Sequence, residues 1–591
     1  MNMILHNNPT ALIRQGNTLA NPLFTDASGQ LKTFDYVVAN PPFSDKRWST
    51  GLDASNDPFE RFTHYGVPPA KQGDYAYLLH IVRSLKSTGK GACILPHGVL
   101  FRGNAEAVIR KNLVQRGYLK AIIGLPANLF YGTGIPACIM VFDKENAHSR
   151  KGIFMVDASK GFIKDGNKNR LRAQDIHRIV DTFTRKLEVP QYSRMVTLAE
   201  ISDPKNDFNL NLPRYIDSTE PEDLQDIDGH LCGGIPDRDI DALDRYWQVV
   251  PAVRPLLFES AGRAGYSRLK VTADKIKAAI LGHAEFATFN ASVTALFAQW
   301  KKANAARLYA IKPGDKPKAL IETLSEELLT IFAKARLIDP YDVYQHLMDY
   351  WAATMQDDVY LIAQAGWVDA AKPRLIVETR EQKSKEQPDF TVGKKKFKSD
   401  LIPAALLIAR YFAAEQAAIE AIETELGALE QQLDEVREEH GGEGGLLEEV
   451  VDEKGKIPKK AVAARLEEIA GDTEAADERK ALTQYSGLLD KQADAKSRLK
   501  AAQEALEAKV AAKYGKLTED EIKTLVVDDK WLAQLAADVQ SELDRVSQAL
   551  TGRIRQLADR YATPLPQLTE EAETLAARVD EHLKKMGAVW D

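Results

Sequence analysis

The chain has 591 residues, which is too many for a single hydrophobic core. We therefore expect three or four structural units. Its hydrophobic content of 44% and charged content of 28% are ordinary for a soluble globular protein. The formal net charge of -7 argues against wholesale, non-specific wrapping of nucleic acid. It leaves room for a local basic groove, or for a partner subunit that supplies positive charge.

Cysteine and histidine usage gives no sign of a metal site. The three cysteines are far apart in the sequence and lack CxxC spacing, which fits a reducing compartment. The eleven histidines form no HExxH or HxH pattern. The longest apolar stretch, residues 402–414, is interrupted by Arg410, and no signal peptide opens the sequence. We therefore expect a cytoplasmic protein with no membrane partner and no metal.

Residues 1–160 alternate short apolar runs with helical patterns. Two amphipathic stretches, residues 74–89 and 104–117, predict helices that each end at a glycine. This alternation indicates an α/β fold with a largely parallel sheet and helices on both faces. Five apolar runs predict the strands: residues 34–40, 91–96, 119–126, 137–144 and 152–159.

From about residue 217 onwards the pattern becomes mostly helical. Residues 218–400 are expected to form a mixed, mostly helical region of unknown role. A coiled-coil helical hairpin is predicted over residues 401–515, with its second helix from about residue 474 to 513. Residues 516–591 predict a final pair of helices. The heptad behind the hairpin places Phe412, Ile419, Leu426 and Leu433 in alternation with Ile408, Ile422, Leu429 and Val436.

The first predicted strand stops abruptly at Asn40-Pro41-Pro42-Phe43, because two consecutive prolines cannot continue a sheet ladder. The amide oxygen of Asn40 and the proline-fixed carbonyl of Pro41 could both accept the hydrogens of an exocyclic base amine. Phe43 offers a face on which a flipped base can stack. Methylation of such an amine needs neither a nucleophilic side chain nor a metal. The alternative is a turn that merely caps a strand, and the motif alone leaves both open.

Six segments carry a resemblance to a known family: MNMILH, GNTL, FDYVVANPPFSD, GKGACILPHGVLFRG, LKAIIGLPANLFYGTGIPACIMVFDK and NDFNLNLPRYID. Their order and spacing resemble the modification (M) subunit of type I restriction–modification systems, which are adenine-N6 DNA methyltransferases. The resemblance covers residues 1–217 and resumes near the C-terminus in GRIRQLADRYATPLPQL and VDEHLKKMG. It implies a partial S-adenosylmethionine-dependent methyltransferase (Rossmann-like) sheet domain, followed by the largely α-helical region with its coiled-coil hairpin.

The resemblance also assigns roles to residues. Asn40, Pro41, Pro42 and Phe43 match the family's catalytic motif. The methyl donor is S-adenosyl-L-methionine, and the family's GDTL contact to it falls here on Asn17, which lacks the charge of the aspartate.

Two aromatic residues in NLFYGTGIPA, Phe130 and Tyr131, are candidates to line a pocket for the extruded adenine. Packing beneath a glycine-rich turn is the alternative for both. Asp74, which comes after the catalytic loop, is expected to be a helix N-cap.

The family's glycine-rich donor loop and its acidic ribose contact both precede the segment that resembles MNMILH. We therefore expect the N-terminal part of the methyltransferase domain, including that loop, to be missing. The expected consequences are an exposed sheet edge and a chain that is marginal alone. A truncated gene product, a fragment restarted at an internal Met, or an upstream partner that supplies the first half would each account for such a missing part.

The partners implied by the resemblance are double-stranded DNA, a specificity subunit, a second M subunit and, further, a restriction subunit. The heptads either form an internal antiparallel hairpin or bind helices of the specificity subunit. The leading function is an adenine-N6 DNA methyltransferase subunit. The alternatives are a catalytically silent assembly scaffold and a methyltransferase that acts on RNA or a free nucleotide.

Overall fold

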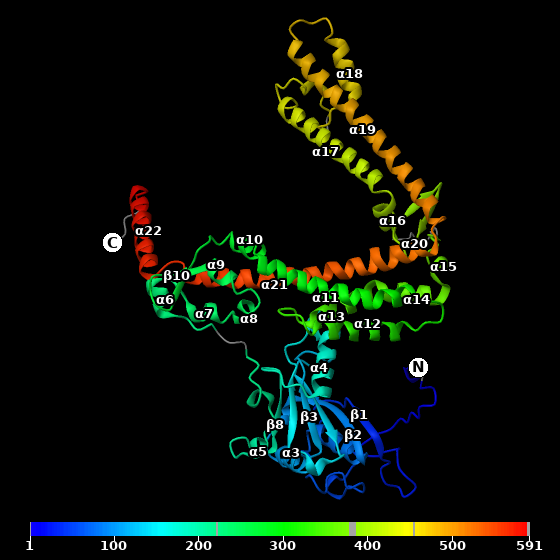
Figure 1. Ribbon diagram of the computed structural model, residues 1–591, viewed down its shortest axis with the longest axis vertical. Helices are drawn as coiled ribbons and strands as arrows, with labels where there is room; N and C mark the ends of the chain where they lie inside the picture. Colours follow the sequence, from blue (N-terminus) through cyan, green and yellow to red (C-terminus); the bar gives the residue numbers. More distant parts are fainter. Residues whose placement is uncertain (1, 7, 220–222, 378–385, 453–454, 588–591) are drawn as a thin grey trace. The chain divides into compact units, whose positions relative to one another are not determined.

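The computed structural model describes residues 2–6, 8–219, 223–377, 386–452 and 455–587 (Figure 1). Its contacts divide the chain into two compact units. The first unit comprises residues 1–242, 258–270 and 555–591, and the second comprises residues 243–257 and 271–554. The C-terminal residues thus group with the N-terminal sheet domain, whereas the sequence alone places them in a separate region.

A six-stranded sheet forms the centre of the first unit, with the strand order β1-β2-β4-β3-β5-β8. Strands β1, β2, β3 and β5 run in one direction, and β4 and β8 run in the opposite direction. The sheet is therefore mixed, and the expectation of a largely parallel sheet is wrong. The connection from β3 to β4 contains no helix, so β4 returns antiparallel to β3. The strands are β1 (Phe34–Ala39), β2 (Leu85–Pro96), β3 (Leu119–Gly124), β4 (Ala137–Asp143), β5 (Gly152–Asp157) and β8 (Ser193–Thr197).

Helices cover both faces of this sheet, as expected (Figure 1). Alternate side chains of a strand point to opposite faces, so neighbouring residues of β3 join different cores. Ile122 packs in the core formed with α2 (Asp74–Arg83) and α3 (Ala105–Gln115). Ile123 packs in the core formed with α4 (Ala173–Arg185). Both residues are buried, so the sheet of this unit has a hydrophobic core on each face.

Helix α2 is shorter than its sequence pattern predicts, because it ends at Arg83 and β2 begins at Leu85. The carbonyl of Ser84 accepts a hydrogen bond from the N–H of Phe34, which starts the pairing with β1. Pairing of Leu85 with Phe34 of β1 outweighs the helical pattern of these residues. Gly91 permits the close approach of β2 to β1, because a Cβ at this position would lie 2.9 Å from the carbonyl oxygen of Val37.

The rest of the first unit consists of short elements. A two-stranded hairpin, β6 (Ile163–Asp165) and β7 (Lys168–Arg170), follows β5. A three-stranded sheet has the order β10-β11-β9. These strands are β9 (Ile235–Pro236), β10 (Phe258–Ser260) and β11 (Tyr266–Leu269), and the helices include α5 (Leu198–Ser202), α6 (Ile227–Cys232), α7 (Asp237–Asp241) and α22 (Leu565–Lys585).

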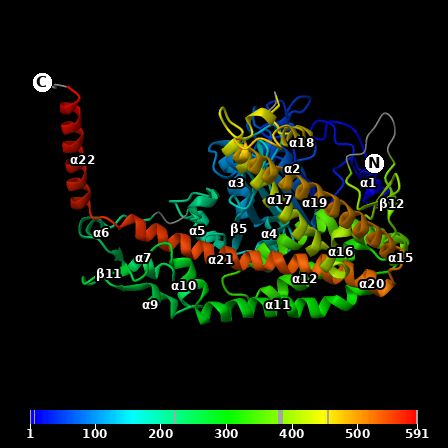
Figure 2. The same ribbon diagram turned by 90° about the horizontal axis from the view of Figure 1, so that it is seen from above.

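The second unit is built from long helices, and the expectation of a largely helical second half is confirmed. Helix α11 (Ala284–Tyr309) lies alongside α21 (Ala533–Arg560), as Figure 2 shows. Trp300 of α11 is fully buried and donates its indole N–H to the carbonyl of Leu324 at 3.0 Å. The neighbouring helices are α12 (Pro317–Phe332), α13 (Pro340–Tyr350) and α14 (Gln356–Ala365). In the part of the chain that the structure describes, no helix is both long and apolar enough to cross a membrane.

The predicted hairpin consists of α17 (Ala413–His440) and α19 (Ala476–Tyr514), which lie side by side in Figure 1. Four α17 residues from the predicted heptad are buried: Ile419, Leu429, Leu433 and Val436. The helices run antiparallel, because Lys509 pairs with Glu415 and Arg498 pairs with Glu425. The heptad does not continue through Phe412, where the separate helix α16 (Ala404–Tyr411) ends. The hairpin's apolar seam is thus largely occupied by its own second helix.

A histidine joins two helices of the second unit and makes its stability depend on pH. His346 of α13 lies 2.9 Å from the carboxylate of Glu542 on α21. This hydrogen bond raises the pKa of His346 against the opposing effect of burial. A histidine with a raised pKa stabilises the folded state fully below its unfolded pKa, and that contribution disappears as the pH rises through the folded pKa.

We expect His346→Gln to lose this pH dependence. Wild type should become less stable by about 1 kcal/mol as the pH rises from about 6 to about 8.5, and the variant should change less. Urea unfolding across this range measures the difference. The exposed His64, which has no ion pair within the described residues, supplies the control His64→Gln. Equal slopes for wild type and His346→Gln would contradict the assignment.

Candidate functional site

The candidate site begins where β1 ends. Asn40 follows the last residue of β1 and is exposed, and its side-chain amide makes no hydrogen bond to any described residue. Pro41 is buried directly behind it. The prolines end the pairing with β2 at Ala39, so the Asn40 amide and the Pro41 carbonyl are left free to accept hydrogens from a ligand.

Other strands end at the same edge of the sheet. Since β1, β2, β3 and β5 run in one direction, their carboxyl ends meet there. His97 directly follows β2, and Asp157 ends β5. Both lie next to the last residue of β3, because a Cβ at Gly124 would be 3.6 Å from His97 Nε2 and 3.7 Å from Asp157 Oδ1.

His97 was not singled out in the sequence, although its position after a strand-ending proline is a usable signal. Its Nε2 is buried without a hydrogen-bond partner in the described part of the chain. Burial lowers the pKa of His97 from its usual value. Asp157, also missed, accepts a hydrogen bond of 2.6 Å from the hydroxyl of Ser218.

The two phenylalanines predicted from sequence meet in the structure. The rings of Phe43 and Phe130 lie 5.6 Å apart, with an interplanar angle of 73°, which is an edge-to-face contact. Phe130 comes from the connection between β3 and β4, so this contact joins that connection to the Asn40 motif. Tyr131 behaves differently, because it is 96% exposed.

A buried carboxylate fixes the loop that follows Phe43. Asp74 Oδ1 accepts a 2.7 Å hydrogen bond from the N–H of Ser44, whose φ of 51° lies in the left-handed region. Arg102 in turn donates to Asp74 Oδ2 at 2.9 Å. The helix N-cap of α2 is Gly73, so the expectation that Asp74 is the N-cap is wrong. Asp74 instead positions the residue next to Phe43.

The start of α2 holds the same loop through further contacts. Tyr77 donates its hydroxyl to Asp45 at 3.0 Å, and the N–H of Gly73 donates to the carbonyl of Asp45. A Cβ at Gly73 would come within 2.7 Å of Trp48, so this position requires glycine. The loop after Asn40-Pro41-Pro42-Phe43 is therefore fixed before any ligand binds.

The predicted donor contact, Asn17, is occupied with local bonds. Its amide oxygen accepts hydrogen bonds of 3.0 Å from the N–H groups of Leu19 and Ala20. A cavity of about 700 Å³ lies beside it along β1, lined by Gly16, Thr18 and Val38 among others. None of the described residues that line this cavity is acidic, so no carboxylate there can bind ribose hydroxyls. The residues around Asn17 therefore supply at most part of a binding site for S-adenosylmethionine.

The β1 side of the sheet is open in the described chain. β1 pairs only with β2 among the described strands, and Tyr36 and Val38 are 75% and 78% exposed. This agrees with the expected exposed sheet edge.

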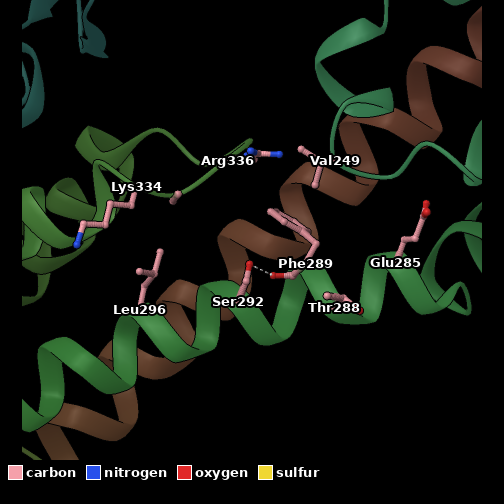
Figure 3. Close-up of a pocket in the computed structure, with 9 residues that line it drawn as sticks. Val249, Glu285, Thr288, Phe289, Ser292, Leu296, Lys334 and Arg336 are labelled. Carbon is pink, nitrogen blue, oxygen red and sulfur yellow. Dashed lines mark hydrogen bonds between the residues drawn. The ribbon is translucent and has the colours of Figure 1, made fainter.

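The described residues outside this edge of the sheet show neither a metal-binding cluster nor a second catalytic arrangement. No group of three or more His, Cys, Asp and Glu side chains that could hold a metal ion occurs among the described residues. The second unit has a cavity of about 420 Å³ beside α11 (Figure 3). Two of its polar side chains make local bonds: Glu285 accepts from the N–H of Ala252, and Ser292 donates to the carbonyl of Phe289. This cavity shows no catalytic arrangement.

Comparison with known proteins gives matches for the part of the chain that carries the candidate site. Residues 1–224 match the family model N-6 DNA Methylase. The type I restriction enzyme MjaVII methylase subunit of Methanocaldococcus jannaschii is 34% identical over 239 residues, which cover 39% of each chain. The type I restriction enzyme MpnII methylase subunit of Mycoplasma pneumoniae is 30% identical over 263 residues, which cover 43% of this chain and 48% of that one. The match thus spans less than half the length of each relative.

Solved structures give a match of similar extent. The type I restriction–modification methyltransferase subunit of Streptococcus thermophilus is 37% identical, with coverage of 36% of this chain and 45% of that one and a TM-score of 0.33. The strand-end motif, the fixed loop behind it and the family match all fall in the same stretch of sequence. Residues 1–224, which carry the candidate site, therefore match the N-6 DNA Methylase family model.

Proposed function

We propose that this chain is the methylating subunit of a type I restriction–modification system. It transfers a methyl group from S-adenosylmethionine to the N6 amine of an adenine that has been flipped out of double-stranded DNA. The observation that carries the proposal is the free amide of Asn40 at the carboxyl end of β1, within a segment that matches the N-6 DNA Methylase family. The chain's own residues supply the binding and orientation of the base.

The proposed roles follow from the geometry. Asn40 Oδ1 and the Pro41 carbonyl accept the two hydrogens of the adenine amine, which concentrates electron density on N6 and aims its lone pair. Phe43, braced by Phe130, provides the ring on which the flipped adenine stacks. Asp74 keeps Ser44, and with it Phe43, in place. Methyl transfer from S-adenosylmethionine to this amine needs no nucleophilic side chain.

The proposal is tested by label transfer. The full chain, assembled with its specificity subunit, is incubated with radiolabelled S-adenosylmethionine and unmethylated duplex DNA. We expect labelled N6-methyladenine. Assembly without any label in the DNA would contradict the proposal and support the alternative, a catalytically silent scaffold.

We further propose that α22 docks a helix of the specificity subunit, and that a second copy of this chain and a restriction subunit complete the complex. None of the described residues of α22 is buried. Leu568, Leu575 and Val579 are 47%, 57% and 55% exposed, and their spacing of seven and four places them on one face of the helix. An apolar stripe of this kind is suited to pairing with another helix.

Leu575→Glu should disrupt this docking. A charge in the middle of the apolar stripe is expected to weaken binding of the specificity subunit by at least about 100-fold, without unfolding the chain, because Leu575 is exposed. Co-purification and calorimetry measure the effect. Ala577→Glu places the same charge on the opposite face and should bind normally. Unchanged binding by Leu575→Glu would remove the docking role from this face.

A further inference from the structure

The connection between β3 and β4 is held in place by the β6–β7 hairpin. The N–H of Asn169 donates to the carbonyl of Asn128 at 2.9 Å, and its side-chain amide donates to the carbonyl of Ala127 at 2.6 Å. Lys168 donates to the carbonyl of Thr133 at 2.9 Å. Asn169 is itself buried, with 6% exposure. The middle of this connection is therefore supported on both sides.

That supported segment presents a bare aromatic ring to solvent. Phe130 turns inward and contacts Phe43, whereas the next residue, Tyr131, is 96% exposed. Gly132, with a φ of 79°, follows it directly. No ring contact or hydrogen bond of the Tyr131 side chain occurs among the described residues. A large exposed aromatic ring on a fixed turn beside the site suggests a surface that is covered when the substrate binds.

The hairpin that supports this turn is basic, although the chain as a whole is acidic. Lys164 and Arg170 of the hairpin are exposed, and Asp165 is the only acidic residue between residues 160 and 172. A local basic segment is the expected contact for the phosphate backbone of DNA. Within residues 160–172 the positive residues are Lys160, Lys164, Lys168, Arg170 and Arg172.

We propose that Tyr131 inserts into the DNA duplex at the position vacated by the extruded adenine, while the β6–β7 hairpin contacts the flanking phosphates. This inference rests on the proposed function. An extruded base leaves a gap in the stack, and an aromatic ring that fills the gap offsets the lost stacking. Tyr131 adjoins the residue that touches Phe43, so one turn serves both the flipped base and the gap it leaves. Tyr131 acts as a positioning residue, and its removal affects base extrusion.

The test compares two duplexes. The target adenine is first mapped in DNA methylated by the wild-type complex, then placed opposite either thymine or an abasic site. Extrusion from the abasic duplex costs little, because the adenine has no pairing partner. Tyr131→Ala should slow methylation of the paired duplex at least about tenfold, and that of the abasic duplex by no more than about threefold. Tyr131→Phe, which keeps the ring, should behave like wild type on both.

The control is Tyr360→Ala, which removes a 54% exposed tyrosine from the second unit and should leave both rates unchanged. An equal loss on the two duplexes, or no loss on the paired duplex, would overturn the insertion role. Failure of the proposed function gives a different result, because the wild-type complex would then form N6-methyladenine in neither duplex, and the insertion role would fall with it.

Discussion

Replacing Asn40 with alanine is expected to lower the rate of N6-methyladenine formation by at least about 100-fold. The variant loses the amide oxygen that accepts a hydrogen of the adenine amine, and no other described side chain at the end of β1 replaces it. Folding should be unaffected, because Asn40 is exposed and its side chain makes no hydrogen bond to the described residues. Label transfer from S-adenosylmethionine to duplex DNA measures the rate, and urea unfolding checks the fold.

Asn8→Ala is the matched control, since it shortens an exposed asparagine away from the end of β1. Asn40→Asp retains an oxygen acceptor and should lose less activity than Asn40→Ala. Methylation by Asn40→Ala at the wild-type rate would show that the amide has no catalytic role, even with the family match intact.

A second large effect is expected for Arg102→Met, which should lower the free energy of unfolding by about 3 to 5 kcal/mol. Arg102 lies 2.9 Å from Asp74 and 3.5 Å from Glu106, whose side chains are 0% and 2% exposed. Without the guanidinium, the two buried carboxylates lose the cation with which both form an ion pair. The loop at Ser44 should loosen as well, so methylation should fall together with stability.

The pH dependence of this loss gives a second check. Burial raises the pKa of Glu106, and Arg102 opposes that rise. Removing Arg102 raises the folded-state pKa further, so the destabilisation should grow as the pH increases above the usual glutamate value. Urea unfolding at about pH 5 and about pH 8 should therefore show the larger loss at pH 8. The control is Arg47→Met, which alters an exposed arginine in the loop that contains Ser44 and should leave the free energy of unfolding unchanged. An equally small change for Arg102→Met would contradict the ion-pair account.

The sequence predicted the parts of the fold that depend on local chemistry. Two consecutive prolines stop a strand whatever surrounds them, so Pro41 and Pro42 located the end of β1 correctly. Phe130 was predicted as a candidate wall of the adenine pocket; the structure brings its ring against Phe43, and its role in binding adenine stays a prediction. The helical hairpin was predictable because its seam repeats every few residues, as Leu429 and Leu433 show.

Features that depend on distant partners could not be predicted. Residues 85–89 continue a helical pattern, yet they join strand β2, where Leu85 pairs with Phe34 of β1. Asp74 looks like a helix cap in sequence, whereas its carboxylate bonds to Ser44, thirty residues earlier in the chain. The exposure of Tyr131 and the lowered pKa of the buried His97 also arise only once separate segments meet.

The measurement that tests the central claim most directly is the identity of the methylated base. DNA from cells that express the full chain with its companion subunits is digested to nucleosides and analysed by mass spectrometry, with Asn40→Ala as the reference. We predict N6-methyladenine with the wild-type chain, and only background amounts with the variant. Methyl groups on cytosine alone, or equal N6-methyladenine in both samples, would contradict the assignment of Asn40 to adenine methylation.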